Sequence, residues 1–391
     1  MVPRKVKLAD NTITKEEISS LATWLQEDHQ LTKGPLTRAF EAQFAQYIGT
    51  KYAVMVNSGS SANLLMAYSL VEGGYLPNKK VIVPAVSWVT TLSPFVQLGF
   101  ECYLCDSDPS DLGIDLEHLE QLLKLHRPAL LILVHILGHP NQMNEIKTLC
   151  SNYSCLIIED ACEALGSEYA GEKAGALSLA GSFSFYYGHH ISTIEGGMIV
   201  LNDERLYNIM LSIRSHGWSR DVMPEYQHAW QHEHAIDEFR EFYTFYYAGF
   251  NLRPTDLNAY LGILQLQRLP EIISIRKRNY ELYQKALPEF WSQISQKSLV
   301  SSFAYGTFVN NRLEVFSHLK ASGIECRPLV CGSMGRQPFW IKRYGEEHLP
   351  VADLVHDYGL YLPNHARITP EDIAYVANCF HSVAKPIHIP T

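Results

Sequence analysis

The 391-residue sequence has no apolar run that approaches the roughly 20 residues needed for a membrane-spanning helix. Its N-terminal stretch, MVPRKVKLADNTITKEE, is charged throughout and has no apolar segment like that of a signal peptide. Runs of basic residues are absent too, and the formal net charge is −9. These absences argue against a membrane or a nucleic acid as partner, and we expect a cytoplasmic protein.

Clustered cysteines are also missing. The eight cysteines are scattered and lie mostly in apolar, strand-like text, where a reducing compartment favours buried thiols over disulfides. Cys102 and Cys105 have the spacing of a metal or redox pair, but no second pair follows at ligand spacing. Because a metal site needs three or four converging ligands, we expect no metal there.

The length fits one large and one smaller domain. From Lys51 onward, apolar strand patterns alternate with helical patterns, which predicts a mostly parallel sheet buried on both faces. The predicted strands are residues 52–56, 81–84, 102–105, 129–135 and 155–159, with helices that include 62–71, 115–124 and 144–152. We predict an N-terminal helical segment (1–33), a large α/β domain (34–269) and a small C-terminal α+β domain (270–391).

The stretch from Ala180 to Asn202 reads as a strand, a turn and a second strand. Alternating serine and aromatic residues predict a half-buried strand over residues 182–187, and the apolar run 198–201 predicts the next. The turn between them carries His189 and His190 at a strand end, where catalytic side chains are often held. Ordinary hydrogen-bonded turn histidines are the other interpretation of such a pair.

Two further features point to a ligand at the carboxyl edge of the sheet. The turn Asn57-Ser-Gly-Ser-Ser links a strand to a helix, so its backbone N–H groups and hydroxyls suit a phosphate, although a plain helix cap has the same composition. Asp160 ends the strand text CLIIED, at the position where α/β sheets bind ligands. A helix cap is the alternative for Asp160 as well.

The segment 215–248 is an aperiodic, aromatic-rich insertion with four histidines: His216, His228, His232 and His234. They lack the i, i+4 pairing with a third ligand that zinc sites show, which disfavours a metal. Such an insertion is more typical of a lid or of a subunit-contact loop.

Together, a phosphate turn at Gly59-Ser60, a carboxylate at Asp160 for a protonated ring nitrogen and an aromatic Trp88 to stack on a flat ring suggest pyridoxal 5'-phosphate. Phrases along nearly the whole chain resemble the DegT/DnrJ/EryC family of sugar aminotransferases and dehydratases. They include KGPLTRAFEAQFAQYIG, VNSGSSA, VPAVSWVTT, IIEDACEALGS, SFSFYYGHHISTIEGGM and GFNLRPTDLNAYLGILQL. The resemblance implies the aspartate aminotransferase-like fold type I.

One position departs from most of the family. His189 stands where relatives have the lysine that binds the cofactor covalently, and no lysine occurs between Lys173 and Lys277. An imidazole cannot make that bond but can act as a general base, so the cofactor, as pyridoxal or pyridoxamine 5'-phosphate, would be non-covalent. A histidine at this position resembles the pattern of the family's nucleotide-ketosugar 3-dehydratases. No cysteine lies between Cys162 and Cys326, which excludes the iron–sulfur cluster that one type of them carries there.

The resemblance implies a reaction. The expected substrate is a nucleotide-linked 4-keto-6-deoxy sugar, GDP-4-keto-6-deoxy-D-mannose, which would lose its C3 hydroxyl in a step of deoxysugar (colitose, O-antigen) biosynthesis. L-glutamate would regenerate the pyridoxamine form, and ammonia would be released. A 3-dehydratase of a CDP- or dTDP-linked ketosugar, and a pseudoenzyme that only binds ligand, remain alternatives. Nothing in the sequence identifies the nucleotide.

The resemblance also implies roles for residues. His189 would be the catalytic base, and the cofactor would be held by Gly59, Ser60, Trp88, Asp160, Glu163, Ser184 and Asn251. Asn251 would reach the phosphate from a neighbouring subunit, which predicts a homodimer with shared active sites. Arg220, Arg253 and Arg327 are loop cations that could meet the diphosphate, although each could equally form a surface ion pair.

Overall fold

The computed structural model describes residues 4–295 and 298–387, so the outer ends of the predicted segments 1–33 and 270–391, and residues 296–297, lie outside the described residues. The helices are α1 (Lys15–Trp24), α2 (Pro35–Ile48), α3 (Gly59–Glu72), α4 (Val89–Gln97), α5 (Leu116–His126), η1 (Ile136–Gly138), α6 (Met143–Asn152), α7 (Glu204–Arg214), α8 (Pro224–Glu233), α9 (Glu238–Glu241), α10 (Asp256–Ala286), α11 (Arg312–Ala321), η2 (Met334–Arg336), α12 (Pro338–Tyr344), α13 (Pro350–Tyr358) and α14 (Pro370–His381). The strands are β1 (Tyr52–Val56), β2 (Lys80–Pro84), β3 (Glu101–Cys105), β4 (Leu130–Val134), β5 (Leu156–Asp160), β6 (Glu168–Tyr169), β7 (Glu172–Lys173), β8 (Ala180–Ser184), β9 (Gly197–Leu201), β10 (Ser298–Leu299), β11 (Tyr305–Phe308), β12 (Arg327–Pro328) and β13 (Gly359–Leu362).

Seven strands form the central sheet, in the order β1-β9-β8-β5-β4-β2-β3. Strands β3, β2, β4, β5 and β8 pair in parallel, whereas β9 is antiparallel to both of its neighbours. The parallel pairing brings the carboxyl ends of β4, β5 and β8 to one edge of the sheet. The predicted α/β class with a mostly parallel sheet is therefore confirmed.

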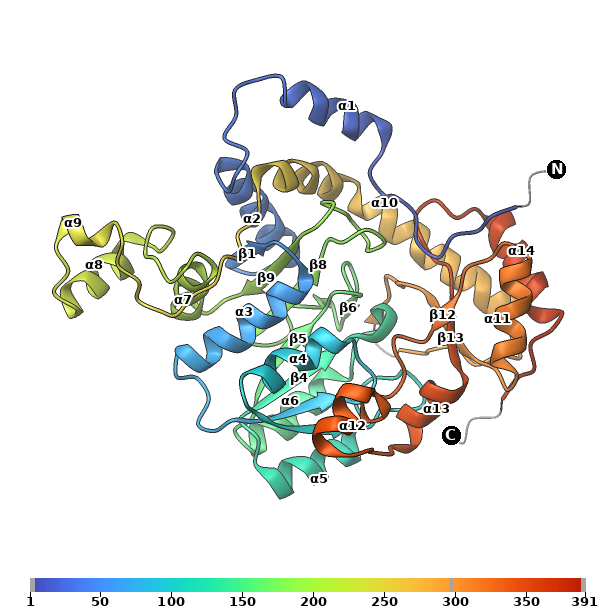
Figure 1. Ribbon diagram of the computed structural model, residues 1–391. Coiled ribbons are helices and arrows are strands. Elements are labelled where there is room, and N and C mark those ends of the chain that lie inside the picture. Colours follow the sequence, from blue (N-terminus) through green and yellow to red (C-terminus); the bar gives the residue numbers. More distant parts are fainter. Residues whose placement is uncertain (1–3, 296–297, 388–391) are drawn as a thin grey trace.

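Helices cover both faces of this sheet (Figure 1). Along β4, Leu130, Ile132 and Val134 join a core cluster with α3, α4 and α7, while Leu131 and Leu133 join a second cluster with α5 and α6. Helices α2 and α10 cover the β1 and β9 end of the second face. Because successive strand residues point to opposite faces, burial on both sides explains why β4 is apolar at every position.

Two predicted features need correction. The strand predicted over residues 182–187 is β8, which ends at Ser184 because its partner β9 begins opposite, at Gly197. Beyond that pair Tyr186 and Tyr187 leave the sheet, and they are exposed at the wall of a cavity. The segment 215–248 is not irregular throughout, since it contains α8 and α9. Neither helix has a fully buried residue, so no hydrophobic period marks them in the sequence. Figure 1 shows these helices on an arm that projects from the body.

A second core lies at the C-terminal end of the chain. The three-stranded antiparallel sheet β11-β13-β12 packs with α11, α14 and the last turns of α10 around Tyr283, Tyr305 and Phe380. Helix α10 runs unbroken across the predicted boundary at residue 270, and Trp340 and Val355 from α12 and α13 belong to the core of the large sheet. The domain boundaries stay a prediction.

The N-terminal segment joins the two parts. Helix α1 begins after the N-cap residue Thr14, which forms a capping box with Glu17. Upstream, Val6 bridges to Ile324 of the C-terminal part, and Gln265 of α10 donates hydrogen bonds to Thr12 and Glu17.

The cysteines are free thiols, and Cys102 and Cys105 are buried in β3. Within the described ranges, no group of three or more histidine, cysteine, aspartate or glutamate side chains is placed to hold a metal ion. None of the helices that the structure describes is both long enough and apolar enough to cross a membrane.

Asp256 gives a test of how α10 and α2 are joined. Its buried carboxylate accepts hydrogen bonds from the N–H groups of Gly34, Leu36 and Thr37, and from the Thr37 hydroxyl. Asp256→Ala should lower the free energy of unfolding by about 3 kcal/mol, because buried donors lose their acceptor. Urea denaturation of this variant measures the loss. The exposed Glu225→Ala variant is the control. Equal stability of the two variants would contradict the stabilising role of the hydrogen bonds to Asp256.

Candidate active site

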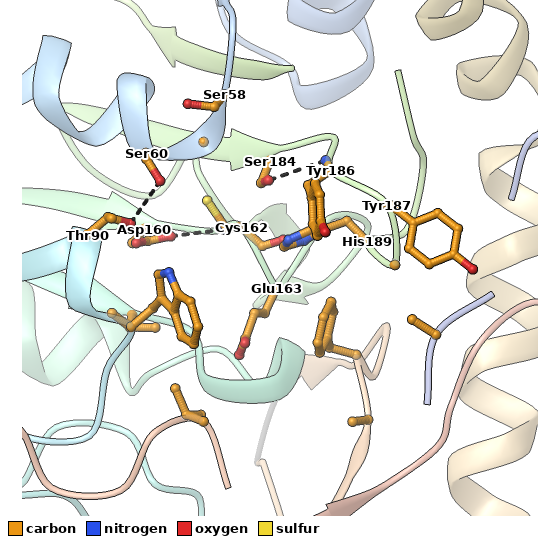
Figure 2. Close-up of a pocket in the computed structure, with 18 of the residues that line it drawn as sticks. Ser58, Ser60, Thr90, Asp160, Cys162, Glu163, Ser184, Tyr186, Tyr187 and His189 are labelled. Carbon is orange, nitrogen blue, oxygen red and sulfur yellow. Dashed lines mark hydrogen bonds between the residues drawn. The ribbon is translucent and has the colours of Figure 1, made fainter. Parts of the chain in front are cut away.

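A cavity of about 490 Å³ opens at the carboxyl edge of the central sheet (Figure 2). Its wall combines the ends of β4, β5 and β8, the first residues of α3 and α4, and segments from both ends of the chain, which contribute Leu8, Ala9, Phe303 and Tyr361. Seven residues predicted for the site line it: Gly59, Ser60, Trp88, Asp160, Glu163, Ser184 and His189.

One side of the cavity suits a phosphate. Ser58 caps α3 by accepting the N–H of Ser61, so Gly59 and Ser60 occupy the first helical turn, where N–H groups lack partners within the helix. These groups and the positive end of the helix dipole attract an anion. A Cβ on Gly59 would lie 2.6 Å from the Cβ of Ser184, so only glycine allows this close approach. Figure 2 shows Ser58, Ser60 and Ser184 on the same side of the cavity.

Asp160 is held in one orientation at the end of β5. One carboxylate oxygen accepts hydrogen bonds from Asn63 Nδ2 and Thr91 Oγ1, both at 2.7 Å, and the other accepts the N–H of Cys162 at 3.2 Å. The side chain is buried, with a residue exposure of 5%. A carboxylate fixed in this way stabilises a protonated ring nitrogen beside it. Sequence reasoning missed Asn63 and Thr91, although a buried asparagine in the apolar helix α3 was a detectable signal.

Trp88 is the N-cap residue of α4, and it remains 56% exposed although it borders the cavity. Large aromatic side chains are rarely left this open in a protein interior, and a flat ring at a cavity wall can stack on another flat ring.

His189 presents a defined tautomer. Its Nδ1 lies 2.8 Å from the carbonyl oxygen of Cys162, and because a carbonyl only accepts, Nδ1 carries the proton and Nε2 keeps its lone pair. Burial lowers the pKa of His189 to about 4, while the hydrogen bond to Cys162 opposes that shift. The positive charge of Arg276 lowers the pKa further. The imidazole is therefore neutral at pH 7 and able to accept a proton at Nε2.

Glu163 supplies a second group that exchanges protons. Burial raises the pKa of its carboxyl to about 7, against the hydrogen bond that it accepts from the N–H of Leu137 at 2.7 Å. Figure 2 places Glu163 across the cavity from Ser58 and Ser60, with His189 between them in this view. Near neutral pH such a carboxyl can donate or accept a proton.

The other predicted residues do not line this chain's cavity. Asn251 is exposed and accepts a hydrogen bond from Arg253, while the neighbouring Leu252 accepts the N–H of Asn57 beside the phosphate turn. Arg220 lies over the ring of Trp218, 4.1 Å from its centroid, and donates to the carbonyl of Phe242.

Arg327 is exposed on β12, where it pairs with Tyr361, a residue of the cavity wall. Phe303, which also lines the cavity and lies 5.2 Å from the His189 ring, had no signal in the sequence, because its position depends on how the C-terminal part packs.

These features fit pyridoxal phosphate. A helix N-terminus with adjacent hydroxyls, an oriented carboxylate at Asp160, an exposed ring at Trp88 and a neutral imidazole border one cavity. None of the lining residues is a lysine, so this wall offers no amine for a covalent bond to the cofactor.

Comparisons with known proteins agree with this geometry. A GDP-4-keto-6-deoxy-D-mannose 3-dehydratase of Yersinia pseudotuberculosis is 34% identical over 386 residues, 95% of this chain and 97% of that protein. The structure of Escherichia coli GDP-4-keto-6-deoxy-D-mannose-3-dehydratase with bound hydrated PLP is 32% identical and has a TM-score of 0.88, with 97% of this chain and 100% of that chain covered.

A further GDP-4-keto-6-deoxymannose-3-dehydratase structure, with a trapped PLP-glutamate geminal diamine, is 31% identical with a TM-score of 0.87, covering 96% and 100% of the two chains. These likenesses confirm the predicted fold type I. The model of the DegT/DnrJ/EryC1/StrS aminotransferase family matches residues 11–381. A match over nearly the whole length leaves one assignment: the chain belongs to the DegT/DnrJ/EryC1/StrS aminotransferase family.

Proposed function

We propose that this protein is a 3-dehydratase that removes the C3 hydroxyl of GDP-4-keto-6-deoxy-D-mannose, giving GDP-4-keto-3,6-dideoxymannose. Pyridoxamine phosphate is consumed, ammonia is released, and L-glutamate restores the amine. One observation carries the proposal: an imidazole, His189, presents a free Nε2 at the site where a lysine would direct the chemistry to amine transfer. The named relatives that are 31–34% identical over nearly the whole chain support the same substrate.

The cofactor would be held without a covalent bond. The first turn of α3, with Ser60 and Ser184, would bind its phosphate, Asp160 its ring nitrogen and Trp88 one face of its ring. When bound, the cofactor acts as an electron sink that makes loss of a neighbouring hydroxyl feasible. Glu163 would lie near its 3-hydroxyl.

The protein's own part in the chemistry is proton handling. Nε2 of His189 takes up a proton inside the cavity and gives it to a departing hydroxyl, which then leaves as water. The bond from Nδ1 to the Cys162 carbonyl holds this tautomer throughout. A lysine at the same place would bind the cofactor covalently and favour leaving an amino group on the sugar.

The homodimer is part of the proposal because of a charge imbalance. Asp160, Glu163 and Glu195 line the cavity, and no lysine or arginine does so among the described residues, although the ligands carry phosphate groups. Asn251 is exposed, accepts a hydrogen bond from Arg253 and comes directly after the arm in the chain. It is suited to reach the phosphate in a neighbouring copy. Arg327, next to Tyr361, and Arg220 would meet the diphosphate.

The reaction itself can be measured directly. Purified protein with pyridoxal phosphate, glutamate and GDP-4-keto-6-deoxy-D-mannose should release ammonia and yield a sugar nucleotide lighter by one oxygen atom. Ammonia is followed by a coupled assay and the product by mass spectrometry. A product that has gained an amine would instead identify an aminotransferase. No turnover with GDP-, CDP- or dTDP-linked ketosugars would favour a ligand-binding protein.

Replacement of the catalytic imidazole tests two consequences of having histidine at position 189: non-covalent binding of the cofactor, and dehydration of the sugar. His189→Lys should bind pyridoxal phosphate covalently, detected by mass after borohydride reduction, and should lose dehydration by about 10²–10⁴-fold, the usual worth of a positioned general base. His189→Asn is the matched control, because it should lose dehydration equally but remain unlinked to the cofactor. Wild-type dehydration in His189→Lys, with no covalent adduct, would overturn the assigned role.

Mixed dimers test the shared site. Asn251→Asp places a negative charge where a phosphate is expected, and His189→Asn removes the base, so each variant alone should be nearly inactive. When the two are co-expressed with different affinity tags and purified as a mixed dimer, one of its two sites is intact if Asn251 serves the partner. About half of the wild-type activity should then return. A mixed dimer as inactive as its parents would place Asn251 outside the partner's site.

A further inference from the structure

Arg276 places a guanidinium behind the turn that carries His189. The residue lies on α10 and is fully buried, with an exposure of 0%. Burial lowers the pKa of Arg276 to about 9, and no carboxylate among the described residues offsets that effect, yet the group remains charged at neutral pH. A buried cation without an acidic partner is costly and calls for a functional explanation.

The guanidinium is solvated by main-chain carbonyl oxygens from separate parts of the chain. Nη2 donates to the carbonyl of His189 at 3.3 Å, and Nη1 donates to the carbonyl of Phe303 at 2.9 Å. Nη1 also donates to the carbonyls of Asn364 and, at 3.4 Å, of Ser302. One side chain thus joins the catalytic turn to two segments of the C-terminal part.

These contacts reach the acid–base groups of the cavity. The Phe303 N–H donates to the carbonyl of Leu137 at 2.8 Å, and the Leu137 N–H donates to Glu163. The neighbouring His190 forms a parallel tie, since its buried Nε2 lies 2.9 Å from the carbonyl of Ser301. These hydrogen bonds therefore hold both the histidine turn and Glu163 against the same segment, 301–303.

We propose that Arg276 is a positioning residue: its forked hydrogen bonds fix the turn of His189 against the segment 301–303. This inference rests on the proposed function, in which His189 is the proton-transfer group. Removing the fork frees the turn, and a displacement of about 1 Å at a reacting group can cost about 10²-fold in rate.

The charges that face His189 act in opposite directions. Arg276 lowers the pKa of His189, and Asp160 raises it, while the carbonyl of Cys162 favours the protonated ring. Glu163 and Glu195 also border the cavity. Burial is the largest effect on the pKa of His189 and remains when the Arg276 charge is lost. Loss of that charge removes one of the effects that lower the pKa, so the pKa of His189 rises and the neutral form is lost at a higher pH than in the wild type.

Arg276→Met removes both the fork and the charge, and Lys277→Met is the matched control, because it removes a charge from the exposed face of the same helix. We expect Arg276→Met to lower kcat about 100-fold with KM nearly unchanged, and to move the acidic limb of kcat to higher pH. Titration of histidine-labelled, cofactor-free protein by NMR, with His189→Asn for assignment, should show the same rise in pKa. Lys277→Met should change none of these.

Arg276→Lys separates the two effects and serves if Arg276→Met does not fold. It keeps a positive charge but has no planar fork, so kcat should fall while the His189 titration stays near that of the wild type. A kcat within about twofold of wild type in Arg276→Lys, or an unchanged titration in folded Arg276→Met, would overturn the inference. The titration needs no substrate, so absence of dehydratase activity would contradict the proposed function without affecting this test.

Discussion

The site depends on the parallel pairing of β5 with β8. That ladder sets Glu159 opposite Gly181 and Asp160 opposite Ser182, so the two strands end side by side at the same edge of the sheet. Asp160 and Cys162 follow from one strand, and Ser184 and the histidine turn from the other. Because β9 then returns antiparallel to β8, the turn cannot leave this edge. The hydrogen bond between Cys162 and His189 is a consequence of that register.

The sequence indicates this edge well but not what surrounds it. Apolar runs between helices predict the sheet, and seven predicted residues meet in one cavity because they follow strand ends or open helices. The end of β8 was missed, since a strand stops where its partner stops and not where its alternation stops. Helices α8 and α9 were missed because neither has a fully buried residue. Thr91 and Phe303 act through tertiary contacts that no local pattern encodes, whereas Asn63 left a signal as a polar residue in the apolar helix α3.

The cavity wall carries carboxylates, and a buried cation lies behind this wall without lining the cavity. Asp160, Glu163 and Glu195 line the wall, whereas Arg276 lies behind it and contacts only carbonyl oxygens in its hydrogen bonds. Burial separates the proton affinities of the two titrating groups, lowering the pKa of His189 to about 4 and raising that of Glu163 to about 7. A neutral imidazole beside a carboxyl that is readily protonated gives one site both a proton acceptor and a proton donor.

The arm of residues 216–250 is closed at its base by the antiparallel bridge between Ser215 and Asn251 and by the hydrogen bond from the His216 N–H to the Phe250 carbonyl. Its two helices contain no fully buried residue, so the arm adds little to the core of the large sheet beyond Val222 and partly buried residues such as Tyr226 and Trp230. Such an excursion can be lengthened, shortened or exchanged without altering the strand order or the catalytic edge. Changes in this one arm could therefore alter what a member of this fold recognises, while the catalytic residues at the edge of the sheet stay the same.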